Sequence, residues 1–496
     1  MMEQVENKSY IKELFSLTSI YGISLFLNKI VSFFLLPIYT NYFQPEELGL
    51  YNLIQSFWLF IIIFYVYGLE TSFLKFFIDG KADEEKTKIY STTLILITTT
   101  SLIFSLILYN FSGYIAQLFS FNNTEKGIHL IKLISILLFF DAISRFPLLL
   151  LRAELKAKIY LFLTILTLFL NIVCNIVFIM LLHYNIESIF ISYIISSLIP
   201  FIIGLIFTKK YLSFIIETDV IKSLLKFGNK FIYVGIFILI IDVSDRFFLK
   251  YFWDERVVGV YSTSYKLASV MNLIISAFKF TWTPYFLHIS ENPENKRIIS
   301  NIFTYFIFAG SFLFLFFSFF IDSIVKTEIF GISFITESYR SGLSILPIIL
   351  LSYFFSGLFA NLNAAPFFTD KTKYIFWVCF IGFIINILLN TILIPLFKMY
   401  GAAYATLGAY FSMFLMIFLV SQKIYHIEYE WTKLIKIVIV VAMTYAAEYA
   451  YEVYSGSRPL YRLLIKLSLF SLSLIIISQL KVVAFSKINI LFKRKN

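Results

Sequence analysis

The sequence predicts an all-α integral membrane protein with about 14 transmembrane helices, arranged as two parallel six-helix bundles around a central cleft plus two C-terminal helices. Its composition, a series of long apolar segments and a weak internal repeat all support this fold class. Hydrophobic residues make up 59% of the 496-residue chain and charged residues 14%, against about 25% charged residues in a soluble domain. One soluble core could not bury so many apolar side chains, so lipid is the expected solvent.

The apolar segments are long enough to cross a bilayer. A transmembrane helix needs roughly 20 apolar residues at about 1.5 Å per residue. The segments that meet this length are 14–39, 48–68, 91–112, 128–150, 159–182, 187–207, 228–250, 257–280, 300–321, 342–364, 374–397, 401–422, 434–453 and 460–481. The weakest is 434–453, which contains Glu448 and several alanines, and twelve or thirteen spans remain the alternative count.

Lysine and arginine predict the orientation of these spans. With the N-terminus inside, most basic residues fall in cytoplasmic connections, including 75–88, 152–158, 209–230 and 481–495. Because cytoplasmic loops are enriched in Lys and Arg, we expect both termini to be cytoplasmic. This bias accounts for most of the net charge of +11 without a nucleic-acid partner.

The chain offers little support for enzyme chemistry. The connections are at most about twenty residues long, and the four histidines lie near span ends or in loops. The sequence contains no HExxH motif, phosphate-binding loop or dinucleotide fingerprint. Cys174 and Cys379 lie in apolar runs and are interpreted as small hydrophobic residues. We therefore expect no enzyme activity, metal or cofactor.

Three pairs of short segments recur at nearly one offset. "YFQPEELGLY" from Tyr42 resembles "YFWDERVVGVY" from Tyr251, "NIVCN" from Asn171 matches "NILLN" from Asn386, and the "KAK" run matches "KTK". A repeat of six spans gives two copies with the same orientation, which typically pack around a cleft. The predicted divisions are an N-terminal lobe at 1–215, a C-terminal lobe at 216–425, and two further helices with a basic tail at 426–496.

Charged residues at membrane depth are costly, about 2.5–3.5 kcal/mol each on insertion scales, and are expected to face a cavity or one another. The candidates for such positions are Lys29, Glu70, Asp141, Arg145, Asp242, Asp245, Arg246, Lys266, Lys279 and Glu448. Lys29 and Lys266 lie far from the span ends and are interpreted as cavity residues. Lys279 lies near an inner end, which is typical of an interfacial lysine.

The segment "IIDVSDRFFLKYF" (240–252) places three charges in an apolar span. Asp242 and Arg246 are four residues apart and share a helix face, while Asp245 reaches the arginine less directly or points toward the outer water. Either the Asp242–Arg246 pair only holds helices together, or Arg246 meets an anion while the acid takes up a proton; exposure of Arg246 at the outer surface is a third reading.

Two other sets of polar residues are interpreted as structural. For Asp141 and Arg145, also four residues apart, a structural pair is favoured. The asparagine pairs of the repeat, Asn171 with Asn175 and Asn386 with Asn390, are expected to bridge helices within each lobe.

The run "SDRFFLKYF" followed by "VVGVYSTSYKLASVMNLIISAFKFTWTPYF" resembles the Wzx-type polysaccharide flippases of the multidrug/oligosaccharidyl-lipid/polysaccharide exporter superfamily, as does "LPIYTNYFQPEELGLYNLIQSF". The resemblance implies transport of an undecaprenyl-pyrophosphate-linked oligosaccharide, such as an O-antigen or capsule repeat unit, from the inner to the outer leaflet. It also implies coupling to H⁺ or Na⁺, a cationic cavity, and a polysaccharide polymerase as partner. Arg246 and Lys266 match its motif positions, and Lys29 is added by its depth. Asp242 and Glu70 are the candidates for ion coupling, with Arg145, Asp141 and Lys279 as secondary candidates.

Two other functions fit the same fold class. A drug or cation exporter of the same superfamily is disfavoured because Lys29, Arg246 and Lys266 would repel a cation. A membrane enzyme of polysaccharide assembly usually needs a large outer loop or an intramembrane histidine. A structural protein without transport activity would leave the charges within the spans unexplained.

Overall fold

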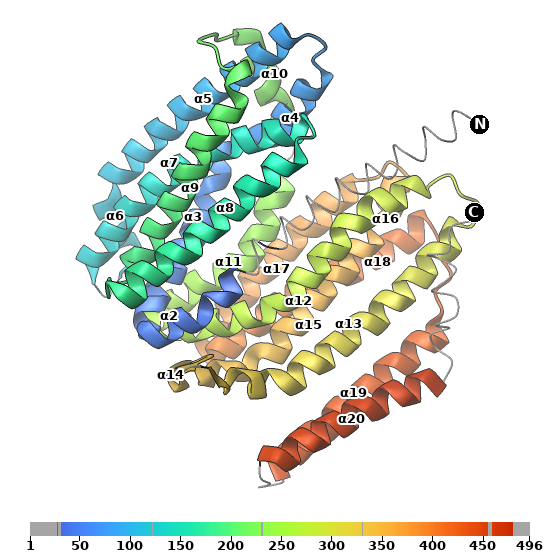
Figure 1. Cartoon of the computed structure of the whole chain (residues 1–496). Helices are drawn as coiled ribbons and strands as arrows, with labels where there is room; N and C mark the ends of the chain where they lie inside the picture. Colours follow the sequence, from blue (N-terminus) through green and yellow to red (C-terminus); the bar gives the residue numbers. More distant parts are fainter. Residues whose placement is uncertain are drawn as a thin grey trace. The chain divides into compact units, whose positions relative to one another are not determined.

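The computed structural model describes residue 27 and residues 31–121, 123–229, 232–329, 331–454 and 459–479. Most of the first predicted span, including Lys29, and the basic tail from residue 480 lie outside these residues. The described chain is almost entirely helical (Figure 1). Within it, the only strands are a short pair, β1 (Glu328–Ile329) and β2 (Ile332–Ser333).

The chain forms two compact units. Unit 1 comprises residues 1–266, 329–342 and 383–405, and unit 2 comprises residues 267–328, 343–382 and 406–496. Helices α12 (Glu255–His288), α17 (Lys373–Phe397), α18 (Met399–Ile424) and the 3₁₀ turn η4 (Ser341–Ile345) contribute residues to both units. The lobe boundaries predicted from the internal repeat stay a prediction.

The other helices of unit 1 follow the order of the chain. They are α2 (Leu36–Tyr42), α3 (Pro45–Val66), α4 (Leu69–Asp79), α5 (Asp83–Asn110), α6 (Ser112–Leu118), α7 (Thr124–Ala153), α8 (Ala157–Asn175), the π-helical η1 (Ile176–Leu181), α9 (Glu187–Thr208), the 3₁₀ turn η2 (Lys209–Tyr211), α10 (Thr218–Gly228), α11 (Ile232–Phe252) and α14 (Glu337–Arg340). Helix α7 packs against α9, α5 and α3. It buries aliphatic side chains such as Leu130, Ile134 and Leu138 along its length, as expected for a central helix.

Local sequence signals explain where these helices begin and bend. Helix α3 starts at Pro45 with a capping box between Gln44 and Glu47, which satisfies otherwise unpaired amide groups. Between α3 and α4, Tyr67 and Gly68 adopt left-handed backbone conformations with φ of 33° and 79°. A Cβ on Gly68 would lie 2.4 Å from the carbonyl oxygen of Gly228. Glycine at this bend thus lets the end of α10 pack against the start of α4.

Unit 2 contains α13 (Asn295–Val325), α15 (Leu346–Leu362), α16 (Ala364–Phe368), α19 (Trp431–Tyr454) and α20 (Pro459–Gln479). Helix α13 packs against α15, α19 and α20, and α19 packs against α20. A buried ion pair joins the last two helices, with Lys466 Nζ 3.0 Å from Glu448 Oε1. The charge that weakened the 434–453 prediction is therefore paired inside the helix hairpin.

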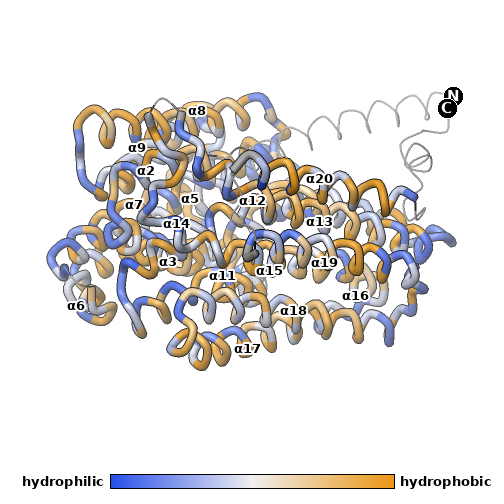
Figure 2. The backbone as a smooth tube through the Cα atoms, turned by 90° about the horizontal axis from the view of Figure 1, so that it is seen from below, coloured by the Kyte–Doolittle hydropathy of each residue, from blue (hydrophilic) through white to orange (hydrophobic). Residues whose placement is uncertain are grey.

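Eleven helices of the described chain are long and apolar enough to cross a membrane, and a twelfth is counted if α10 and α11, bent by 55°, form one span. Apolar residues dominate these helices in Figure 2, and hydrophilic residues gather in many of the connections. Helix α12 covers the predicted span 257–280 but is not among the eleven. Hydroxyl-bearing residues, Lys266 and Lys279 make its sequence too polar to qualify. The protein is therefore a multi-pass membrane protein, while the count of 14 stays a prediction.

Candidate functional site

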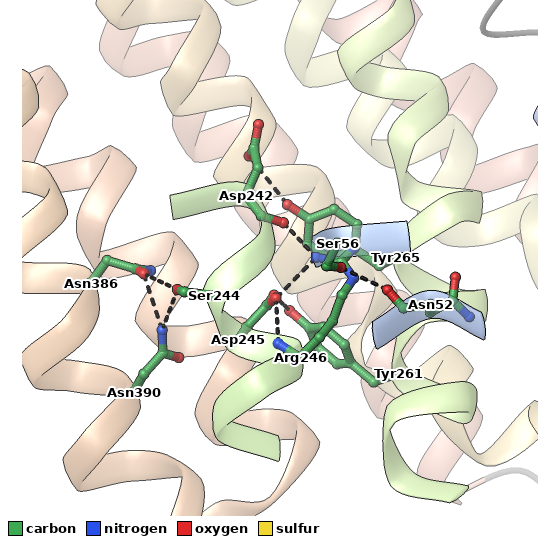
Figure 3. Close-up of polar contacts among 10 residues, drawn as sticks. All are labelled: Asn52, Ser56, Asp242, Ser244, Asp245, Arg246, Tyr261, Tyr265, Asn386 and Asn390. Atoms are coloured by element: carbon green, nitrogen blue, oxygen red, sulfur yellow. Dashed lines mark hydrogen bonds and ion pairs between the residues drawn. The ribbon is translucent and has the colours of Figure 1, made fainter. Parts of the chain in front are cut away.

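The charges of α11 form one buried cluster in unit 1. Arg246 Nη1 lies 3.0 Å from Asp245 Oδ1 and donates to the backbone oxygen of Asp242 at 2.5 Å. The second Asp245 oxygen accepts a hydrogen bond from the hydroxyl of Tyr261 on α12. Asp245 is fully buried and Arg246 is 8% exposed. Figure 3 shows these contacts.

The predicted pairing of these charges needs correction, because Asp245 supplies the carboxylate that contacts Arg246. Asp245 does not point to the outer water; its Oδ1 also accepts the backbone N–H of Arg246 at 2.8 Å. Asp242 contacts Arg246 through its backbone carbonyl, and its carboxylate accepts a hydrogen bond from Tyr265 at 3.3 Å. The i, i+4 spacing does bring Asp242 to Arg246 through its backbone carbonyl, and the neighbouring Asp245 adds a direct carboxylate contact.

Two of the candidate cations, Arg246 and Lys266, lie over tyrosine rings. The Arg246 guanidinium is 4.6 Å from the ring centre of Tyr265, and Lys266 Nζ is 4.8 Å from that of Tyr51. Such contacts stabilise a cation away from bulk water by about 0.5–2 kcal/mol. Sequence reasoning did not single out either tyrosine as a cation partner, although Tyr265 lies in the "YKLA" run beside Lys266.

The repeated Gly-x-Tyr segments meet at a close helix crossing. A Cβ on Gly49 of α3 would lie 1.7 Å from the carbonyl oxygen of Glu255, and one on Gly259 of α12 would lie 1.9 Å from that of Pro45. Only glycine allows the first turns of α3 and α12 to approach so closely. The tyrosines two residues later, Tyr51 and Tyr261, contact the candidate cation Lys266 and the buried Asp245. The two Gly-x-Tyr segments therefore place one tyrosine beside Lys266 and the other beside Asp245.

The asparagine pairs bridge helices, as predicted. Ser244 Oγ of α11 donates to Asn386 Oδ1 of α17 at 2.9 Å, and Asn390 Nδ2 donates to the same oxygen at 3.0 Å (Figure 3). In the other copy of the motif, Tyr39 of α2 donates to Asn175 of α8 at 3.0 Å. Ser244, which sequence reasoning passed over, completes the first bridge next to the charged cluster. Interhelical hydrogen bonds of this type contribute about 0.6 kcal/mol on average in membranes.

A second charged cluster lies between α4 and α7. Arg145 Nη1 is 2.8 Å from Glu70 Oε1, and its Nε is 3.2 Å from Asp141 Oδ1. The indole N–H of Trp58 donates to the other Asp141 oxygen at 3.0 Å. The Asp141–Arg145 pair is present as predicted, and the structure adds Glu70 to it. The side chains of Arg145 and Glu70 are 35% and 37% exposed.

Aromatic contacts connect the second cluster with the first. The Trp58 ring packs edge-on against Tyr193 of α9, with ring centres 5.2 Å apart. Tyr193 lies beside Tyr51, whose ring lies under Lys266. Unit 1 thus contains a continuous series of aromatic and charged side chains from Glu70 to Arg246.

The remaining candidate, Lys279, lies in unit 2. Its Nζ donates to Ser356 Oγ of α15 at 3.1 Å. It is half-buried rather than an exposed interfacial lysine. In the described part of the chain, no group of three or more His, Cys, Asp or Glu side chains is arranged to hold a metal ion.

The structure is a multi-pass helical membrane fold with charged side chains clustered among its helices. The structure of the lipid II flippase MurJ in an inward closed conformation superposes with a TM-score of 0.76 at 16% identity, covering 93% of this chain and 98% of that one. An inward-facing multidrug resistance MATE family transporter of the MOP superfamily gives 0.67 at 13% identity, covering 81% and 95%. A MATE transporter from Vibrio cholerae gives 0.61 at 14% identity, covering 84% and 97%. These similarities show a shared fold.

The sequence itself shows the family. The model of the polysaccharide biosynthesis protein family matches residues 15–290, more than half of the chain, so the chain belongs to that family. A comparison with curated protein sequences gives no significant match.

Proposed function

We propose that this protein moves an undecaprenyl-pyrophosphate-linked oligosaccharide from the inner to the outer leaflet of the bacterial cytoplasmic membrane. The observation that carries the proposal is the placement of two cations, Arg246 and Lys266, over tyrosine rings in segments expected at membrane depth. Cations in a medium of low dielectric constant attract an anion strongly, and a pyrophosphate supplies the compensating charge. Arginine suits phosphate because its planar donors bind two oxygens at once.

The second cluster suits the sugar part of the substrate. Trp58 and Tyr193 offer aromatic faces, while Glu70, Asp141 and Arg145 offer hydrogen-bonding groups. Charged side chains that are about one-third exposed at membrane depth fit a water-filled path better than lipid, where a charge is costly. The series of contacts from this cluster to Lys266 supports a path along which the sugar and the pyrophosphate are held at separate positions.

Transport by alternating access, with the two repeats as moving lobes, forms part of the proposal. Parallel repeats with a shared site suit such a cycle. Coupling to H⁺ or Na⁺ through Glu70 or Asp242 also belongs to the proposal, as do the cytoplasmic location of both termini, a role for Lys29, and cooperation with a polysaccharide polymerase. The orientation follows from the basic residues of the connections.

A cation exporter is the competing function, because the fold also matches multidrug transporters. The measurement is polymer export in a strain that lacks the gene, normalised to the amount of protein in the membrane. Arg246→Ala and Lys266→Ala should each lower export about tenfold or more, since charge-assisted hydrogen bonds contribute about 1.5–3 kcal/mol. Arg256→Ala, which removes an exposed arginine paired with Glu46, should leave export unchanged. Full export in the first two variants, or export of cationic dyes that both variants retain, would contradict the proposal.

A further inference from the structure

Residues 209–228, which follow the α9 span, form a segment with apolar side chains on its surface. The side chain of Phe214 is fully exposed, and Leu212, Ile216 and Leu225 are also exposed. The apolar positions 212, 214 and 216 are exposed, while positions 213 and 215 between them are half-buried. A surface of this kind is unfavourable in water.

The backbone of this stretch is held against α5. Ser91 Oγ donates to the Tyr211 carbonyl at 2.7 Å and accepts the N–H of Ser213 at 2.8 Å. Thr92 Oγ1 accepts the N–H of Glu217 at 3.1 Å. The exposure of Phe214 therefore does not result from a loosely attached loop, because hydrogen bonds on both sides fix the chain that carries it.

A groove lies between this stretch and α5. It is lined by Leu94, Ile95 and Thr98 of α5 together with Leu212 and Phe214, and its volume is about 420 Å³. Half of the eight lining residues are apolar and half carry hydroxyl groups, and the groove begins at Ser91, after the charged first turns of α5. The position and lining suit a lipid acyl chain at the boundary between the hydrocarbon and the headgroups.

Lysines surround the apolar side chains. Lys209, Lys210, Lys222 and Lys226 are all exposed. Lys210 pairs with Asp83 at 2.7 Å and Lys222 with Asp219 at 3.3 Å. Within the described residues, no carboxylate lies in ion-pairing distance of Lys209 or Lys226. The segment therefore carries an excess of positive charge beside its apolar face. Amphipathic segments with this combination bind the interface of membranes that contain anionic lipid.

We propose that residues 209–228 form a binding site for an anionic phospholipid, with an acyl chain against Phe214 and the headgroup phosphate near Lys209 and Lys226. Helix α10 is fixed for this role by packing against α4 and α5, with its buried Leu224 turned inward and its lysines outward. The proposal concerns a lipid of the surrounding bilayer and is independent of the transported substrate.

The test uses the full chain reconstituted in vesicles, with Phe214→Trp as a reporter and wild-type protein as the background to subtract. All vesicles consist mainly of unlabelled phosphatidylcholine, with a fixed fraction of a lipid that carries bromines near the glycerol end of its acyl chains. In one set the brominated lipid is phosphatidylglycerol, and in the other it is phosphatidylcholine. We expect bromine to quench the reporter, and to quench it more when the brominated lipid is phosphatidylglycerol. A triple variant combines the Phe214→Trp reporter with Lys209→Gln and Lys226→Gln. Compared with the reporter alone, its preference for phosphatidylglycerol should fall by about fivefold for each lysine removed.

Two controls make the result decisive. Tyr114→Trp reports on another exposed aromatic position, on α6, and should show no preference between the lipids. Added salt should weaken the preference for phosphatidylglycerol at position 214 even when all lysines are present. This second measurement tests the role of charge without a lysine variant, which could be poorly folded. A reporter that bromine does not quench would place the segment in water or against a soluble partner and overturn the proposal. Equal quenching by both lipids would overturn the anionic specificity.

Discussion

At the scale of single residues, the site depends on how Asp245 is held. Its two oxygens contact Arg246 and Tyr261, and all three groups are buried. A buried carboxylate is tolerated only when charged and hydrogen-bonding partners compensate its lost hydration. The arrangement fixes the arginine side chain, so under the proposed function its geometry toward an anion is set before the anion arrives.

Removing one tyrosine hydroxyl should show which acid matters for this arrangement. Tyr261→Phe leaves a buried Asp245 oxygen without its donor, so we expect the free energy of unfolding to fall by about 1–3 kcal/mol. Tyr265→Phe removes the longer, 3.3 Å bond to Asp242 and should cost less than about 1 kcal/mol. Thermal unfolding of the purified variants in one detergent measures both. A larger loss for Tyr265→Phe would show that Asp242 is the acid on which the cluster depends.

Substitution of Glu70 and Asp242, the two proposed carriers of the coupling ion, tests whether transport is coupled through them. Glu70→Gln keeps the shape of the side chain but removes the charge that lies 2.8 Å from Arg145. If Glu70 carries the coupling ion, transport by this variant should lose its dependence on pH or Na⁺ while the protein level in the membrane stays normal. Asp242→Asn is the matched variant in the other cluster. Unchanged pH and Na⁺ dependence in both variants would exclude these acids as carriers.

At the scale of elements, the close crossing of α3 and α12 depends on Gly49 and Gly259. Gly259→Ala places a methyl group 1.9 Å from the Pro45 carbonyl oxygen, so the helices must separate. We expect a loss of about 1–3 kcal/mol in the free energy of unfolding, the usual cost of overpacking, together with reduced transport. Gly113→Ala is the matched control, because nothing lies within 4 Å of its added Cβ. Equal stability of the two variants would show that the crossing adjusts without cost.

At the scale of the whole molecule, the orientation predicted from charge is open to direct measurement. Reporter fusions at Lys81, Lys222 and Lys433 should give cytoplasmic signals, and fusions near Gln44, Asn123 and Ser457 should give periplasmic ones. The reason is the excess of Lys and Arg in the first group of connections. A periplasmic signal at Lys222 would contradict the parallel repeat, since the two halves would then begin on opposite sides.

Much of the fold could be predicted from the sequence, because each apolar segment carries its own length signal. Span 257–280 was predicted as a helix and lies in α12, although its polar residues make it too hydrophilic for a simple span criterion. The asparagine bridges could be predicted because the spacing of Asn386 and Asn390 places both on one helix face. The number of membrane spans and the lobe boundaries depend on how the helices pack against one another, and the periodicity of a single segment does not determine that packing.

The site could be predicted only in part. The sequence identified Arg246 and Lys266 by their depth, but not the partners that orient them. Asp245 contacts Arg246 because Tyr261, sixteen residues away, holds its other oxygen, and Lys266 lies over Tyr51, a residue of α3. Such contacts between distant segments leave no local pattern in the sequence.

The central claim is that Arg246 meets the pyrophosphate rather than merely neutralising Asp245. The direct test is transfer of an undecaprenyl-pyrophosphate-linked oligosaccharide across vesicles that contain purified protein, with Asp245→Asn combined with Arg246→Gln. This pair of changes removes both charges and keeps hydrogen-bonding groups, so the protein should fold without a stranded buried charge. If Arg246 binds the pyrophosphate, transfer should stay at least about tenfold below wild type, while Arg256→Ala should remain fully active. Wild-type transfer by the double variant would contradict the account, because it would show that the arginine serves only to balance the aspartate.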